Sequence, residues 1–248
     1  MDKEYYRLYF DIERNHWWFK ARSRILRNYI KKNIAGDRTL EILNVGVATG
    51  ASSVMLQEFG KVVSLEYDAE PIEFIKGKVP IEVIQGSILE LPFEDDQFDL
   101  VCAFDVIEHV EDHELAIKEV KRVAKRAGSV LLTVPAGMNL WSEHDEINHH
   151  FRRYSLPELD RLVNRSGGER VYSSYFNFFL FPFIYTARKV TELVRDKKRV
   201  VRSDFEKFSP GILGSVLYLI MKSESILLNR KVRLPWGVSA LLHWKKEG

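Results

Sequence analysis

The sequence is poor in cysteine and has no long uninterrupted apolar run. Its 248 residues include one cysteine, Cys102, which excludes an internal disulfide framework. Cys102 lies in the apolar stretch 100–104, where a buried, unreactive thiol is expected. These features favour a reducing compartment such as the cytoplasm.

The sequence also predicts neither a signal peptide nor a membrane-spanning helix. Residues 1–14 are charged and aromatic and lack the apolar segment of a signal peptide. No stretch offers about 20 uninterrupted apolar residues, so a membrane-spanning helix is not expected. We expect a cytoplasmic protein, with peripheral contact to a membrane as the alternative.

The formal net charge of +2 is unevenly distributed. Residues 171–248 carry 14 Lys and Arg against 6 Asp and Glu, whereas residues 1–170 have an excess of acidic side chains. This change of sign predicts a change in organisation near residue 170.

Residues 40–135 alternate between strand-like and helix-like segments. Because strands separated by helices form βαβ units, the alternation predicts a parallel sheet with ligands at the carboxyl ends of its strands. The expected strands are 40–45, 61–66, 81–85, 98–104 and 129–134, and the expected helices are 51–59, with Gly60 as a stop, 71–78 and 112–126.

The flanking regions predict further helices and two more strands. Residues 1–35 and 155–166 are helical in pattern, and 178–229 are mostly helical and very apolar. Strands at 171–177 and 238–244 would complete a Rossmann-like, seven-stranded, mostly parallel α/β sheet with helices on both faces and a helical C-terminal insertion. We divide the chain into an N-terminal helical cap (1–35), a core (36–177), and a helical cap with a closing strand (178–248).

The turn after the first strand has the character of a nucleotide site. Small residues from Gly46 to Gly50 let the backbone approach a ligand closely, and the next helix offers its N-terminal N–H groups. Twenty residues after Gly46, at the end of the second strand, Glu66 can accept hydrogen bonds from both hydroxyls of a ribose.

Two competing nucleotide folds fit this turn less well. A dinucleotide-binding dehydrogenase uses the spacing G-x-G-x-x-G, whereas Gly46, Ala48 and Gly50 follow a shorter G-x-G-x-G pattern. No lysine of a P-loop follows the turn, which excludes a P-loop nucleotide-binding site. A nicotinamide-dependent oxidoreductase remains a weaker alternative.

Residues 40–135 as a set resemble the class I S-adenosylmethionine (SAM)-dependent methyltransferases, in particular the bacterial type 11 and 23 group. The stretch 42–50 resembles the family motif ILDVGCGTG, and 105–110 resembles its "evlEHv" segment. Residues 86–88, 91–93 and 98–101 resemble its "GDA…LPF…FDLV" segment.

The resemblance implies SAM as cofactor, S-adenosylhomocysteine as product, and a role for each matching residue. Gly46, Val47, Ala48 and Gly50 would line the methionine part, and Asp105 and Val106 would lie beside the methionine or the sulfonium. Glu66 would hold the ribose, while Tyr67, Ser87 and Ile88 would contact the adenine.

Three positions depart from the family pattern. Asn44 and Ser87 stand where the family usually has Asp, and Ala48 stands where it has Gly. Ala48 adds a methyl group to a crowded turn, and Ser87 lacks a charge. These departures motivate a second hypothesis, a SAM-binding interaction module without strong catalysis.

The segment 16–22 (HWWFKAR) is similar to one that opens many bacterial methyltransferases of this group. A helix there would close over the SAM pocket and bring Phe19 and Arg22 near the cofactor. The alternative is a helix that is simply anchored by aromatic packing.

The stretch 141–154 follows the fifth strand, where the methyl acceptor is expected, and it resembles the same group's "W…hD…gH.RRYs" segment. His144, His149 and His109 are candidate bases, the first two being favoured, with Asp145 as base or orienting residue. Arg152 and Arg153 can clamp an anionic group of the acceptor, and Trp141 and Tyr154 complete the acceptor-binding set. His144, Asp145 and His149 match no strong zinc pattern, so no metal is expected.

The acceptor is expected to be a small molecule, such as a hydroxyl of a sugar-like or lipid-linked metabolite. The aromatic and basic stretch 175–202 suits either a hydrophobic acceptor or an anionic membrane surface, and equally a packed lid or homodimer interface. No recognised nucleic-acid motif accompanies the basic residues, so no nucleic-acid partner is expected.

Overall fold

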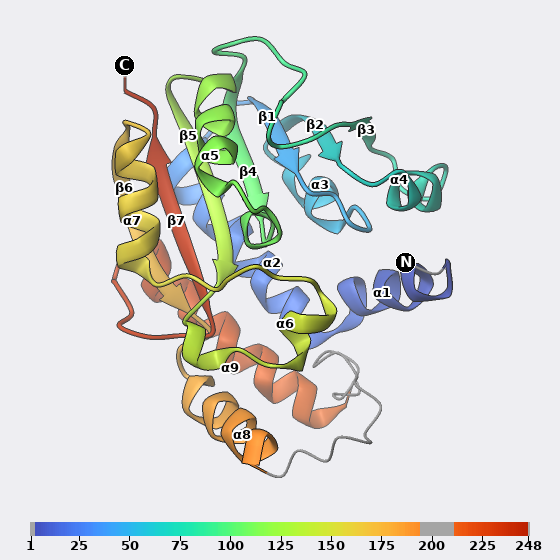
Figure 1. Ribbon diagram of the computed structural model, residues 1–248, viewed down its shortest axis with the longest axis vertical. Coiled ribbons are helices and arrows are strands. Elements are labelled where there is room, and N and C mark those ends of the chain that lie inside the picture. The colour runs from blue at the N-terminus through green and yellow to red at the C-terminus, as the bar shows by residue number, and fades with distance from the viewer. Residues whose placement is uncertain (1–2, 194–210, 248) are drawn as a thin grey trace.

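The computed structural model describes residues 3–193 and 211–247 (Figure 1). Seven strands form one sheet in the order β3-β2-β1-β4-β5-β7-β6. The strands are β1 (Leu40–Val45), β2 (Gly60–Glu66), β3 (Glu82–Gln85), β4 (Phe98–Phe104), β5 (Ala124–Pro135), β6 (Glu169–Phe176) and β7 (Ser239–Lys245).

The sheet is parallel except where β7 is inserted. The pairs among β1 to β5 are parallel, and β7 runs antiparallel to both β5 and β6. The strand order reverses between β1 and β4, so the carboxyl ends of these two strands border the place where a doubly wound sheet binds its ligand. The expected fold class is confirmed.

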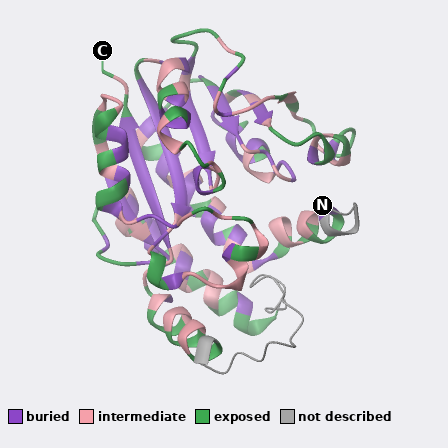
Figure 2. Ribbon diagram, in the orientation of Figure 1, coloured by how far each residue is buried: buried purple, intermediate pink, exposed green. Residues whose placement is uncertain are grey.

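Helices cover both faces of the sheet, whose strands are largely buried (Figure 2). Apolar side chains of α5 and α7 pack on one face, and those of α2, α3 and α9 pack on the other. The helices are α1 (Lys3–Asn15), α2 (Trp17–Ile30), α3 (Ala51–Leu56), α4 (Ala69–Ile75), α5 (His113–Val123), α6 (Glu143–Ile147), α7 (Leu156–Arg165), α8 (Phe181–Leu193) and α9 (Ile212–Asn229), with the shorter turns η1 (Lys31–Ala35), η2 (Ile107–His109) and η3 (Met138–Leu140).

A buried polar chain connects α2 to the sheet. The Tyr29 hydroxyl lies 3.0 Å from Nδ1 of His243 on β7, and Nε2 of the same ring lies 3.1 Å from the Ser129 hydroxyl on β5. Burial raises the pKa of Tyr29 and lowers the pKa of His243 to about 3, so both groups are neutral at physiological pH. Neutral partners avoid the cost of an isolated buried charge.

Several expected boundaries are wrong, among them that of the helix expected over 71–78, which is Ala69–Ile75 in the structure. The helix expected over 51–59 ends at Leu56, and Gly60 begins β2 instead of ending a helix. A Cβ at Gly60 would lie 1.9 Å from the Leu40 carbonyl oxygen, so the close approach of β1 requires glycine there. The helix expected over 112–126 ends at Val123, because Ala124 already pairs with Phe98 in the sheet.

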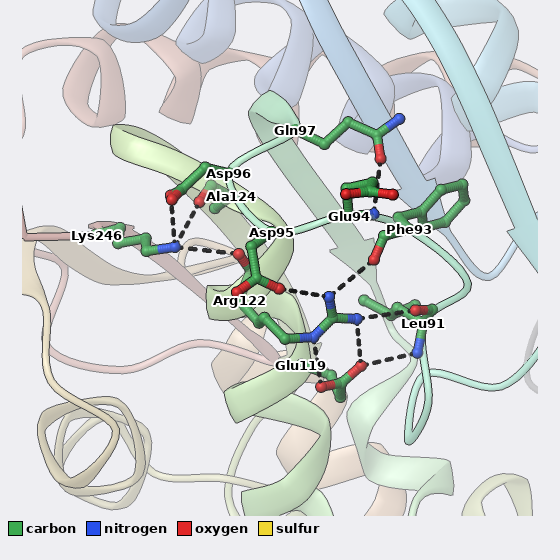
Figure 3. A network of polar contacts seen from close by, with 10 residues as sticks. All are labelled: Leu91, Phe93, Glu94, Asp95, Asp96, Gln97, Glu119, Arg122, Ala124 and Lys246. Atoms are coloured by element: carbon green, nitrogen blue, oxygen red, sulfur yellow. Dashed lines mark hydrogen bonds and ion pairs between the residues drawn. The ribbon is translucent and has the colours of Figure 1, made fainter.

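Arg122 anchors the stretch 91–97 to α5 (Figure 3). Its guanidinium group makes five hydrogen bonds, two to Glu119 and one each to Asp95, the Phe93 carbonyl and the Leu91 carbonyl. These bonds match all five donors of an arginine. The "LPF" part of the family-like segment therefore has a structural role here, and this stretch lies away from the nucleotide turn.

Within residues 3–193 and 211–247, one helix has the length and mean hydropathy of a membrane-spanning segment. This helix is α9, with a mean hydropathy of 1.3. It packs on the core through Met221 and Leu228, which are fully buried. It also buries Glu224, whose carboxylate accepts hydrogen bonds from the backbone N–H groups of Phe178 and Phe179. Core packing therefore accounts for only part of the apolar character of α9, because 28% of the helix is buried.

Glu224 gives the fold a testable pH dependence. Burial raises its pKa from the usual 4.5 to about 7, so the folded state holds the proton more tightly than the unfolded state. Its stabilising contribution is complete below about pH 4.5 and is lost as the pH rises through 7. We expect Glu224→Gln to stabilise the protein by about 2–3 kcal/mol more at pH 8 than at pH 4.5, as measured by urea unfolding. An equal effect at both pH values would contradict this assignment.

Candidate active site

The glycine turn after β1 lies against the end of β4. Gly46 has φ +77° and Gly50 has φ +88°, a region that favours glycine. A Cβ at Gly46 would lie 2.5 Å from Cγ2 of Val106. Two segments that the sequence analysis assigned to the same cofactor are thus in close contact, and the cradle between them has no room for a larger residue.

Ala48, which stands where the family usually has glycine, also adopts a left-handed conformation, with φ +48°. Such a conformation costs an alanine roughly 1 kcal/mol relative to its usual backbone regions. The turn thus keeps the family's backbone shape, although the Ala48 side chain disfavours this conformation.

Glu66 holds this turn through its carboxylate. One oxygen accepts hydrogen bonds from the backbone N–H groups of Val47 and Ala48, and the other accepts from those of Tyr67 and Asp68. The carboxylate is half-buried at the end of β2, the position expected for a ribose-binding acid. The expected adenine neighbour Tyr67 has 70% of its surface exposed, so its side chain is accessible to a ligand.

Asn44 and Ser87 make internal hydrogen bonds. The Asn44 amide donates to the hydroxyls of Ser52 and Ser53 on α3, while its own buried oxygen has no hydrogen-bond partner among the described residues. The Ser87 hydroxyl accepts from the Leu89 N–H, and Ile88 is buried in the core beside it. The departures at 44 and 87 therefore fit the local structure.

An ion pair joins the N-terminal helices to the sheet at this edge. Nη2 of the buried Arg22 lies 2.5 Å from Asp105 at the end of β4 and 3.0 Å from the Thr133 hydroxyl on β5. The guanidinium group also lies over the rings of Trp18 and Phe104. The expectation that segment 16–22 approaches the site is consistent with this placement.

Phe19 lies in an aromatic cluster between α1 and α2. Its ring packs edge-on against Tyr9 and Trp18, and 7% of its surface is exposed. Aromatic packing, the simpler of the two interpretations of segment 16–22, therefore describes Phe19, while Arg22 reaches the site.

Sequence reasoning did not identify the residues of α1 that contact the glycine turn. Arg14 donates to the hydroxyl and the carbonyl of Thr49, and Glu13 accepts a hydrogen bond from the same hydroxyl. Burial raises the pKa of Glu13, although the bond from Thr49 and the charge of Arg14 oppose this effect. The only signal in the sequence for Glu13 and Arg14 is their position immediately before segment 16–22.

Asp145 organises the expected acceptor segment. Its carboxylate is fully buried and accepts hydrogen bonds from Nδ1 of His150, Nε of Arg153 and the Ser142 backbone N–H. Burial alone would raise the pKa of Asp145, but the bond from His150 and the charge of Arg153 outweigh it and lower the pKa. A permanently ionised, fully bonded carboxylate fits the orienting role and not that of a base.

Two expected acceptor-binding residues lie inside the protein. Arg153 is 4% exposed and bonds to Asp145 and the Ala136 carbonyl, and Tyr154 is 2% exposed. The Tyr154 hydroxyl lies 2.8 Å from Nδ1 of His113 and bonds to the Ile107 carbonyl. Their positions do not support direct contact with an acceptor, because these polar groups already have partners within the protein.

The other expected acceptor-side residues lie nearer the surface. Trp141 and Arg152 are half-buried, and Arg152 donates to the Glu111 carbonyl. His149 is exposed, with φ +54° in the turn after α6. His144 lies one turn away on α6, and its ring contacts that of His150 at a centroid distance of 6.1 Å.

His109 meets the same cluster from the other side. Its ring lies edge-on to that of His150, with centroids 4.6 Å apart. Desolvation, and then the charge of His150, lower the pKa of His109 to about 4, so this ring is neutral at physiological pH. The structure thus groups three histidines, one of which, His150, the sequence analysis did not select.

The set of side chains that could bind a metal also differs from the one weighed in the sequence. Within the described part of the chain, Glu108, His109 and His150 offer ligand atoms that all lie within 4.8 Å of one another. His144, Asp145 and His149 form no such group there. The difference arises because η2 and the turn after α6, which are distant in sequence, lie side by side.

Comparison with known proteins identifies the family. A family model described as "Methyltransferase domain" matches residues 43–132. A demethylmenaquinone methyltransferase of Bacillus cereus is 32% identical over 222 residues, covering 86% of this chain and 88% of the relative. The chain therefore belongs to the SAM-dependent methyltransferases.

A more distant relative is matched over only part of its length. A Mycobacterium tuberculosis protein named "Probable S-adenosylmethionine-dependent methyltransferase" is 26% identical over 161 residues, which span 63% of this chain and 57% of the relative. The match therefore covers little more than half of that relative.

Solved structures share the fold at low sequence identity. A phosphoethanolamine N-methyltransferase of Haemonchus contortus in complex with SAM has a TM-score of 0.58 and 18% identity, covering 90% of this chain and 52% of that one. The cyclase SpnF has a TM-score of 0.59 and 15% identity, covering 94% and 86%. Since proteins named for different reactions share this fold, the fold alone does not define the reaction.

The turn 46–50 yields a prediction for cofactor binding. Glu66→Ala removes both the expected acceptor for ribose hydroxyls and four hydrogen bonds to the backbone, so we expect SAM affinity to fall at least tenfold in calorimetry. Asp68→Ala, an exposed carboxylate two residues away, is the matched control and should bind SAM like the unaltered protein. Equal affinities for all three proteins would remove Glu66 from the site.

The left-handed turn yields a second prediction. Ala48→Gly relieves the unfavourable backbone conformation, so we expect SAM affinity to stay the same or rise by up to about fivefold. A loss of affinity in calorimetry would show that the Ala48 methyl group contributes to the site.

Proposed function

We propose that this protein transfers a methyl group from SAM to a small-molecule acceptor, a hydroxyl of a sugar-like or lipid-linked metabolite. The observation that carries the proposal is the arrangement at the carboxyl ends of β4 and β5. Val106, next to Asp105, adjoins the glycine turn, and His109, three residues further on, meets His150, whose ring in turn contacts that of His144. A cofactor cradle and a group of proton acceptors therefore lie on neighbouring segments.

Methyl transfer from SAM requires little of the protein beyond positioning of the reactants. SAM supplies a methyl group on a positively charged sulfonium, whose thioether is a good leaving group. The chain has to hold the acceptor oxygen in line and to remove its proton. His144 and His149 remain our candidates for the base, because both lie in the segment after β5.

A lipid-linked acceptor is supported by the surface around α8 and α9. Phe183, Ile212 and Leu213 have 74%, 89% and 62% of their surface exposed. Arg188 on α8 donates to the Leu140 carbonyl, which attaches this helix to the acceptor segment. The B. cereus relative named for demethylmenaquinone points to an acceptor with an apolar part. Part of the stretch 175–202, expected to contact a membrane, lies outside the described residues.

The alternative of a SAM-binding module without catalysis has less support. It rested on the departures at Asn44, Ala48 and Ser87, but Asn44 and Ser87 make internal hydrogen bonds and the turn keeps its left-handed shape at Ala48. The nicotinamide alternative also has less support, because the turn keeps the short spacing and the relatives reported above are named as methyltransferases.

The base is tested by two single variants. We expect either His144→Ala or His149→Ala to lower the turnover number at least 100-fold while SAM affinity stays within about twofold of the unaltered protein. The measurement is transfer of label from methyl-labelled SAM to the active fraction of a host extract, with calorimetry for SAM. Unchanged turnover in both variants would remove these two histidines as bases.

A further inference from the structure

Glu108, His109 and His150 converge from two separate segments. Glu108 and His109 belong to η2, after β4, and His150 follows α6. The Phe151 N–H donates to the Glu108 carbonyl at 2.8 Å, which fixes the two segments next to each other. Their three ligand atoms lie within 4.8 Å of one another, as noted above.

The Glu108 carboxyl group has no partner within the described structure. The residue is fully buried, and neither of its side-chain oxygens has a hydrogen-bond partner. A buried carboxylate without a partner is costly, and a buried protonated carboxyl still needs an acceptor for its O–H. The orphaned oxygens therefore indicate that a cationic group belongs beside them.

The two histidines are already oriented as metal ligands are. Nδ1 of His150 bonds to the Asp145 carboxylate at 2.8 Å, and the His109 ring hydrogen-bonds to the Asn148 carbonyl. Histidines that bind metals usually engage their second ring nitrogen with a carboxylate or a backbone carbonyl in this way. Each ring thus keeps one nitrogen for an ion.

We propose that Glu108, His109 and His150 bind a divalent transition-metal ion of the zinc type. Two imidazoles and one carboxylate suit Zn²⁺, and three protein ligands leave a further position open. Ligand atoms around tetrahedral zinc are separated by about 3.3 Å, so the site contracts slightly on binding. His109 is exposed at the surface, so its side chain has room to make that adjustment.

The open position gives the ion a place in the proposed reaction. An oxygen of the acceptor would fill it, next to Asp105 at the end of β4. This use of the ion rests on the proposed function, whereas metal binding does not.

The test is titration of the chelator-treated full-length protein with ZnCl2 in a calorimeter, without SAM or acceptor. We expect one Zn²⁺ per chain and a loss of affinity of at least 100-fold in Glu108→Gln, which keeps the shape of the side chain but not its charge. Glu111→Gln, an exposed carboxylate close by, is the matched control and should bind Zn²⁺ like the unaltered protein. Co²⁺ in place of Zn²⁺ should give visible d–d absorption, lost in Glu108→Gln.

Two outcomes would overturn the proposal. One is no Zn²⁺ binding at all, which would mean that Glu108 holds only a proton. The other is equal binding by the unaltered protein and Glu108→Gln, which would assign the ion to surface histidines. Circular dichroism checks that Glu108→Gln folds, and we expect it to be about as stable as the metal-free protein, because a neutral amide of the same shape replaces the carboxyl group. SAM binding is measured separately, so failure of the metal site leaves the proposed function intact.

Discussion

The ion pair between Arg22 and Asp105 connects the parts of this molecule on which the site depends. Arg22 comes from the N-terminal helices, Asp105 ends β4, and Thr133 on β5 accepts a further hydrogen bond from the same guanidinium group. Arg22 is buried, so loss of Asp105 would leave an uncompensated charge. The pair therefore fixes the N-terminal helices over the strand ends where both the cofactor and the acceptor segments meet.

Different physical constraints determine the structure on the cofactor side and on the acceptor side of the site. On the cofactor side, backbone geometry dominates, because the approach of Gly46 to Val106 leaves no space for a side chain. On the acceptor side, a buried charge dominates, because Asp145 must keep its partners His150 and Arg153. The closely packed glycine turn thus lies beside a segment that is held by a buried carboxylate. This arrangement suits in-line methyl transfer, in which positioning supplies much of the rate acceleration.

The sequence predicted the parts of the fold that depend on local pattern. The strands of the sheet and the cofactor turn followed from hydrophobic periodicity and from the spacing of Gly46, Gly50 and Glu66. The sequence could not predict that Arg153 and Tyr154 are buried, because their burial depends on how the segment after β5 folds back onto that strand. The proximity of Glu108 and His109 to His150 could not be predicted for the same reason, since 41 positions separate His150 from His109 in the chain. Gly60 was misjudged because only the neighbouring β1 reveals why glycine is needed.

The central claim is that the turn at Gly46 holds SAM and that its methyl group leaves for a small molecule. The most direct test incubates methyl-labelled SAM and fractionated host extract with the unaltered protein and with Gly46→Ala, whose added Cβ would meet Val106 at 2.5 Å. The account predicts that the unaltered protein labels a small-molecule fraction and that Gly46→Ala labels none. Label transfer by neither protein, or equal transfer by both, would contradict it.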